Sequence, residues 1–187
     1  AGFATVCTNR FTSELADASL VVFTGGEDVD PALYGVTDVD SRTSFCKQRD
    51  HIDVAAFNAW QHHHVDTKFA GICRGSQFLY AMMGGKLQQH ICGHAIPGTH
   101  NLSIMQGPKK GMEIEITSTH HQCWNLSHRP DGFTLMGLGP NGIPEVGLIQ
   151  QRHKPECLLV QGHPEYMSKD SAGFQYYLEL VEWFYNL

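Results

Sequence analysis

The segment Gly71-Ile72-Cys73-Arg74-Gly75 constrains this chain more than any other feature. An apolar run of strand length, residues 69–73, leads into it, and residues 74–83 follow with apolar side chains at helical spacing. A cysteine flanked by glycines at a strand–turn–helix junction is typical of a nucleophile elbow, where side chains at the glycine positions would collide with the neighbouring strand and helix. The sequence therefore predicts that Cys73 is a nucleophile on a strained turn.

The helix that follows Cys73 also predicts the chemistry of the thiol. A helix N-terminus directs its dipole and its free N–H groups at the sulfur, which favours the thiolate. We therefore expect a lowered pKa for Cys73. The backbone N–H of Arg74 would be one donor of an oxyanion hole.

A cysteine nucleophile needs a base that also returns the proton. Among twelve histidines, His163 is the best candidate, because His163-Pro164-Glu165 directly follows the strand-like run 158–161. In an extended segment, residues two apart project to the same side, so the Glu165 carboxylate can accept a hydrogen bond from His163 and set its tautomer. The predicted triad is Cys73, His163 and Glu165.

Apolar runs of strand length alternate with helical stretches in the first half, which predicts an α/β fold with a mostly parallel, doubly wound sheet flanked by helices. In the second half, Gly, Pro and Asn turns separate strand-like runs, which predicts an antiparallel extension. The expected strands are 3–8, 20–24, 69–73, 102–105, 112–116, 133–138, 145–149 and 158–161, and the expected helices are about 50–62, 74–83 and 172–184. Only the eleven residues 9–19 separate the first two runs, so the first βα unit is expected to be missing or shortened.

Length and charge exclude several classes of protein. The 187 residues predict one domain, 1–187, and 42% apolar residues supply a sizeable core. The net charge of −6, with scattered cations, argues against nucleic-acid binding. No apolar run of membrane-spanning length and no basic leader region are present, so a soluble, cytoplasmic protein is expected. Six cysteines without a Cys-x-x-Cys pair are expected to be reduced thiols.

The two motifs together resemble the class I glutamine amidotransferase-like superfamily. Segments 24–35, 84–89 and 118–122, with Arg49-Asp50, are similar to the gamma-glutamyl-gamma-aminobutyrate hydrolase (peptidase C26) branch. The resemblance implies a flavodoxin-like α/β fold and a Cys-His-Glu triad. It also implies cleavage of the γ-amide of glutamine or of a γ-glutamyl amine, through a γ-glutamyl thioester on Cys73.

The same resemblance assigns residues around the triad. Gly26 matches the glycine whose N–H joins that of Arg74 in the oxyanion hole. Gln77 matches a residue near the glutamyl α-amino and carboxylate groups, and His121 and Gln122 match a loop that lines the same pocket. From the residues alone, Gln77 would equally serve as a helix cap, and the loop would equally be a solvated turn.

Two positions depart from the pattern of this branch. Gly162 stands before His163 where the branch often has an aromatic residue, and Thr117 stands where an Asn is expected before Ser118. These departures leave the predicted chemistry intact, but they leave the identity of the released amine open.

Three functions remain open at this stage. The first is a stand-alone hydrolase of a small γ-glutamyl substrate, without metal or organic cofactor, and the second is a glutaminase that delivers ammonia to a separate synthetase. The third is a non-catalytic metal-binding module, because neutral imidazoles ligate zinc. Its candidate groups are His62-His63-His64, His90 with His94, and His120-His121, although Gly93 weakens a helical His90/His94 pair. We favour the first.

Overall fold

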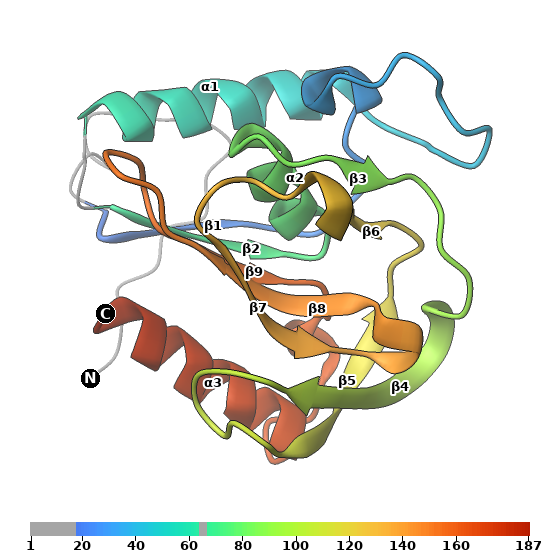
Figure 1. Ribbon diagram of the computed structural model, residues 1–187, viewed down its shortest axis with the longest axis vertical. Helices are drawn as coiled ribbons and strands as arrows, with labels where there is room; N and C mark the ends of the chain where they lie inside the picture. The colour runs from blue at the N-terminus through green and yellow to red at the C-terminus, as the bar shows by residue number, and fades with distance from the viewer. Residues whose placement is uncertain (1–17, 64–66) are drawn as a thin grey trace.

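The computed structural model describes residues 18–63 and 67–187, and Figure 1 traces them as a central sheet with helices on both faces. The helices are α1 (Lys47–His63), α2 (Arg74–Met82) and α3 (Ala172–Tyr185). The strands are β1 (Leu20–Phe23), β2 (Lys68–Ile72), β3 (Leu87–Gln88), β4 (Ala95–Ile104), β5 (Glu113–Thr119), β6 (Cys123–Trp124), β7 (Phe133–Leu138), β8 (Pro144–Ile149) and β9 (Cys157–Val160). Short 3-10 helices cover Pro31–Tyr34, Leu126–His128, Pro140–Gly142 and Pro164–Tyr166.

The main sheet has seven strands in the order β1-β2-β9-β8-β7-β4-β5. β1, β2 and β9 are parallel, and each further pair from β9 to β5 is antiparallel. Strands β3 and β6 form a separate antiparallel pair. The predicted α/β class, with helices on the sheet and an antiparallel extension in the second half, is confirmed.

Each face of the sheet has its own hydrophobic core. On one face, α1 and α2 bury a cluster that includes Phe57, Phe69 and Phe78, whose rings lie at tilted or edge-on angles to one another. On the other face, α3 packs Tyr176 and Leu180 against the antiparallel half of the sheet.

The α3 surface corrects one expectation. The three- and four-residue spacing of apolar residues in 172–184 predicts that Leu178 packs in the core with Tyr177 and Phe184. Tyr177 and Phe184 are buried, but Leu178 is 52% exposed. Gly173 lets the helix approach β5 closely, because a Cβ there would come within 2.4 Å of the Glu115 carbonyl oxygen.

The predicted strand 3–8 and the predicted shortening of the first βα unit lie outside the described residues. Within the described residues, none of the helices combines the length and the apolar character that crossing a membrane requires.

Candidate active site

Cys73 occupies the turn between β2 and α2, with φ 49° and ψ −113°. Its backbone N–H donates to the Val160 carbonyl oxygen at 2.7 Å, which ties the turn to β9. A Cβ on Gly71 would lie 2.5 Å from the backbone of Ser76, and one on Gly75 would lie 2.0 Å from the Phe23 carbonyl oxygen. The strained backbone therefore persists only because both flanking residues are glycines.

His163 lies directly after β9, and its side chain is fixed by two neighbours. Its Nδ1 is 2.6 Å from the Glu165 Oε1, and its ring stacks on Tyr166 with centroids 4.6 Å apart. Because Glu165 accepts from Nδ1, the neutral imidazole keeps Nε2 free as a proton acceptor. The His163 side chain is only 8% exposed, whereas that of Glu165 is 47% exposed.

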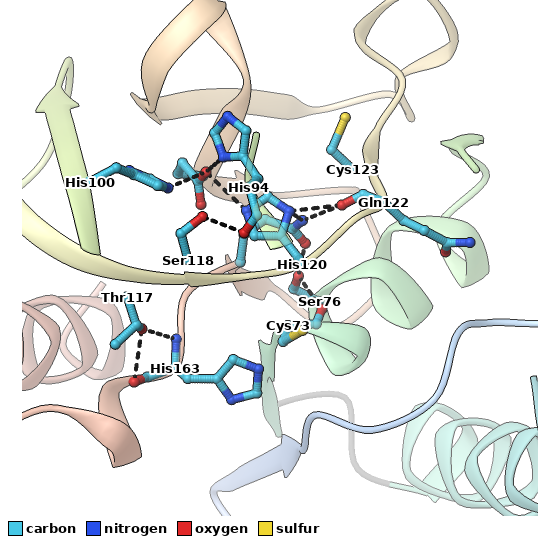
Figure 2. Close-up of polar contacts among 12 residues, drawn as sticks. Cys73, Ser76, His94, His100, Thr117, Ser118, His120, Gln122, Cys123 and His163 are labelled. Carbon is cyan, nitrogen blue, oxygen red and sulfur yellow. Dashed lines mark hydrogen bonds and ion pairs between the residues drawn. The ribbon is translucent and has the colours of Figure 1, made fainter. Parts of the chain in front are cut away.

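Strand order brings the predicted nucleophile and base to one edge of the sheet. β2 and β9 are parallel neighbours, with Ile72 opposite Val160, so Cys73 and His163 both follow the carboxyl ends of adjacent strands (Figure 2). Gly25, beyond the end of β1, lies under the imidazole: a Cβ there would be 2.6 Å from His163 Cε1. Among the described side chains, no hydrogen bond joins the Cys73 sulfur to His163.

The pKa of Cys73 contradicts the sequence-based expectation of an activated thiol. Burial raises the pKa of this thiol to about 12, and the backbone N–H of Arg74 opposes the rise only in part. The carboxylates of Glu165, Asp28 and Glu145 raise it further. The helix N-terminus is present as expected, but desolvation of the sulfur outweighs it.

Gly26 and Arg74, the two residues predicted to donate to the oxyanion, lie in segments that one network of ion pairs and hydrogen bonds links together. Gly26 adopts φ +150°, and a Cβ there would lie 2.8 Å from Arg49 Nη1. Arg49 donates to the carbonyl oxygens of Thr24 and Gly25, each at 3.2 Å. Arg49 also contacts Asp53, which accepts from the buried Arg74 guanidinium.

The Arg74 side chain was not expected to be buried. It is 1% exposed, and its second partner, Asp50 Oδ1, lies 2.5 Å from Nη2. Burial raises the pKa of Asp50, against the effect of Arg74. Arg74 thus offers its backbone N–H to the site and uses its side chain to brace α1 against the elbow helix.

The three predicted pocket residues are brought together, but each of them contacts another group of the protein. Gln77 Nε2 donates to the Gln122 carbonyl oxygen at 3.2 Å, and Gln122 Nε2 donates to Thr43 Oγ1 at 3.3 Å. His121 Nε2 lies 3.1 Å from the Asp28 carboxylate. In this arrangement, Gln77 supports the backbone of the loop with which it was expected to line the substrate pocket.

Gln161 is a site residue that sequence reasoning missed. Its Oε1 accepts from Ser76 Oγ at 2.8 Å, and its Nε2 donates to the Gln122 carbonyl oxygen at 2.9 Å. It is fully buried and so connects the elbow helix to the His121-Gln122 loop. The one feature of the sequence that could have indicated Gln161 is its position directly after β9, two residues before His163.

One cavity among the described residues lies beside these groups, and Cys73 is not among its lining residues. Its volume is about 420 Å³, and it is lined by Val36, Asp38, Asp40, Arg42, Leu87, Gln89 and His90. The His90 ring lies 5.8 Å from that of His121, so the cavity adjoins the predicted pocket loop.

Four other residues have the chemistry to hold a metal ion: His94, His100, His120 and Glu145. The sequence analysis considered His94 together with His90, and His120 together with His121. His100 and Glu145 were not among its candidates. Burial alone would raise the pKa of Glu145, yet the surrounding imidazoles of His100, His120 and His94 hold it well below its usual range.

Comparison with known proteins gives the family. The sequence model of the Peptidase C26 family matches residues 8–165. A glutamine amidotransferase-like protein of Lactococcus lactis, YvdE, is 29% identical over 84% of this chain and 70% of its own length. A protein of Mycobacterium tuberculosis that is named as a glutamine amidotransferase, Rv2859c, is 27% identical over 83% of this chain and 53% of its own length.

A synthetase and two solved structures are also similar to this chain. The glutamine-hydrolysing GMP synthase of Brucella melitensis is 33% identical over 51% of this chain, and the match spans only 19% of that enzyme. A Thermoplasma acidophilum structure described as a GMP synthase subunit superposes with a TM-score of 0.63 at 20% identity, over 93% of this chain and 74% of that one. A glutamine amidotransferase from Thermotoga maritima gives 0.56 at 18% identity, over 79% of this chain and 56% of that one. At these identities the structures establish the shared fold.

Proposed function

Because the chain belongs to the Peptidase C26 family, we propose that it is a cysteine-dependent amidohydrolase that cleaves the γ-amide of glutamine or of a γ-glutamyl amine. The supporting observation is the strained Cys73 turn at the same sheet edge as the His163–Glu165 pair. In this proposal, Cys73, His163 and Glu165 are the triad, and the N–H groups of Gly26 and Arg74 form the oxyanion hole.

Acylation begins with a proton transfer. A buried thiol with a pKa of about 12 is protonated at neutral pH, so the S–H proton must pass to His163 Nε2 as the sulfur attacks. A carbon–sulfur bond forms at the amide carbon, and the carbonyl oxygen becomes an oxyanion at the two backbone N–H groups. Each donor can contribute about 3 kcal/mol to the transition state.

Collapse of that intermediate breaks the carbon–nitrogen bond. His163 returns its proton to the departing nitrogen, so ammonia or the amine leaves and a γ-glutamyl thioester remains on Cys73. Water then attacks the thioester with His163 as base, which releases glutamate and restores the thiol. Glu165 keeps the proton of neutral His163 on Nδ1 in both halves.

The test is covalent labelling by a glutamine-analogue diazoketone, followed by intact-mass measurement. We expect one adduct on the wild-type chain, none on Cys73→Ala, and an unchanged adduct on Cys92→Ala, which removes an exposed thiol outside the site. In parallel, ammonia release from glutamine is compared with amine release from γ-glutamyl amines. Undiminished labelling of Cys73→Ala would remove Cys73 as the nucleophile.

A second function has specific support. The Brucella relatives are glutamine-hydrolysing GMP synthases, and the matched part spans a fifth or less of each enzyme. We therefore propose, as the alternative, a glutaminase subunit that delivers ammonia to a separate synthetase. Negligible glutaminase activity alone, with strong stimulation by an added synthetase, would favour this alternative over the stand-alone hydrolase.

A further inference from the structure

Three imidazoles converge on one carboxylate oxygen in the antiparallel half of the sheet (Figure 2). Glu145 Oε1, on β8, lies 3.0 Å from His120 Nε2, 3.1 Å from His94 Nδ1 and 3.2 Å from His100 Nε2. His94 directly precedes β4, His100 lies on β4, and His120 directly follows β5. Three of the four side chains are at most 1% exposed, and that of His100 is 6% exposed.

His100 directs its two ring nitrogens at different partners. Its Nδ1 lies 3.2 Å from the Asn101 carbonyl oxygen, which can only accept, so Nδ1 donates there. Its buried Nε2 lies 3.2 Å from Glu145 Oε1 but has no hydrogen bond among the described residues. The second ring nitrogen is therefore placed as a ligand atom beside the carboxylate.

Other buried atoms of the cluster also have no hydrogen-bond partner within the described part of the protein. These are the Nε2 atom of His94 and the Oε2 atom of Glu145. A buried polar atom without a partner costs about 1–3 kcal/mol, so several in one place point to a missing ligand. The backbone closes one side, because a Cβ on Gly139 would lie 2.9 Å from Glu145 Oε1.

We propose that His94, His100, His120 and Glu145 form a binding site for a divalent transition-metal ion of the zinc class. Zinc takes imidazole nitrogen and carboxylate oxygen at about 2.0–2.2 Å, so tetrahedral ligands stand roughly 3.3 Å apart. The oxygen-to-nitrogen distances are already near that value, and all four ligand atoms lie within 4.8 Å of one another. Four protein ligands leave no open position, which is the pattern of a structural site.

The surroundings of two ligands match those of metal-bound histidines, which usually donate their second ring N–H to a carbonyl or carboxylate. His100 Nδ1 does so to Asn101. His120 Nδ1 lies 2.9 Å from the Gln122 carbonyl oxygen, which accepts a proton from it in the metal-bound tautomer, and 3.0 Å from Gln161 Nε2. That carbonyl also accepts from Gln77 and Gln161. The ion would thus fix the loop behind the candidate pocket.

The experiment uses untagged protein purified with Zn²⁺ and then dialysed against metal-free buffer. Elemental analysis is expected to find about one zinc per chain in the wild type and in His51→Gln, which removes an exposed histidine on α1. His100→Gln is expected to bind Zn²⁺ at least tenfold more weakly. Replacement of zinc by Co²⁺ should give the visible absorption of four-coordinate cobalt in the wild type.

The wild-type measurements decide the proposal even if His100→Gln misfolds. Failure of the wild type to retain Zn²⁺ after dialysis, or to give the cobalt spectrum, would overturn the proposal. That result would favour a doubly protonated His100 paired with Glu145. Equal zinc affinity in folded His100→Gln and His51→Gln would also overturn it by locating the ion elsewhere. None of these outcomes bears on labelling of Cys73, so the proposed amidohydrolase is tested separately.

Discussion

Thr117 holds the backbone of His163 through a single hydroxyl group. The Thr117 Oγ1 accepts from the His163 N–H at 2.7 Å and donates to the His163 carbonyl oxygen at 3.0 Å (Figure 2). β5, which carries Thr117, lies at the far end of the sheet order from β1, so this contact anchors the predicted base to the antiparallel half.

Thr117→Val keeps the shape of the side chain but removes both hydrogen bonds. Because the His163 N–H and carbonyl would lose their buried partner, we expect a loss of about 1–3 kcal/mol in unfolding free energy and a lower kcat. Chemical denaturation and glutaminase kinetics measure the two effects. Thr117→Ser keeps the hydroxyl and serves as the control; a Val variant as active as the Ser variant would contradict the positioning role.

Gly25→Ala is expected to displace the imidazole. The added Cβ would lie 2.6 Å from His163 Cε1, so the ring must move away from its present place, and we predict at least a tenfold lower kcat. Gly35→Ala is the comparison, because no atom lies near its Cβ and its φ is 70°. That variant should lose about 1 kcal/mol of stability through backbone strain but keep its kcat.

Removal of the Arg74 side chain should destabilise the fold strongly. Arg74→Met leaves Asp50, which is 2% exposed, and Asp53 without their shared cation. Breaking a buried pair in this way costs about 3–5 kcal/mol. Arg42→Met breaks an exposed pair with Asp40 and should change stability little. Urea denaturation compares them, and equal losses would contradict the assigned burial.

Glu165→Gln should lower kcat about 10²-fold, because a neutral amide no longer stabilises the His163 imidazolium. His163→Ala should abolish acyl transfer. Steady-state kinetics and diazoketone labelling check both variants, and wild-type rates in either would remove that residue from the proposed triad.

Stability should fall as the pH rises above about 9. Burial raises the pKa values of Cys73 and Cys123 to about 12 from an ordinary value of 9.0, and it raises that of Cys157 as well. The unfolded chain therefore loses these protons first, and the stability present below pH 9 is lost as the pH rises toward the folded pKa. The slope is at most about 1.4 kcal/mol per pH unit for each thiol.

Denaturation between pH 9 and 10 measures that slope before ordinary tyrosines ionise. Cys123→Ala should reduce the slope, whereas Cys92→Ala, at an exposed position, should not. Identical slopes in both variants would show that the buried thiols do not cause the alkaline loss.

Many of the predictions from the sequence depended on patterns within short segments. The glycines around Cys73 and the triplet from His163 to Glu165 fix backbone shape over a few residues, so the elbow and the His163–Glu165 contact follow from short segments. The terminal helix was also predicted, and Tyr177 and Phe184 are buried as expected, but Leu178 is exposed. The close approach of Gly173 to β5 is a contact with a distant segment, which the spacing within the helix does not contain.

The sequence by itself determined the α/β class, the elbow and the family resemblance, because strand runs, turn residues and short motifs are properties of neighbouring residues. Only the tertiary structure decided the raised pKa of Cys73, the Thr117 contact with His163 and the gathering of His100 with Glu145. Each depends on how segments far apart in the chain exclude water from one another. Burial of the Cys73 sulfur and the convergence of distant side chains depend on packing across the sheet. The spacing of residues within a short segment does not predict either of them.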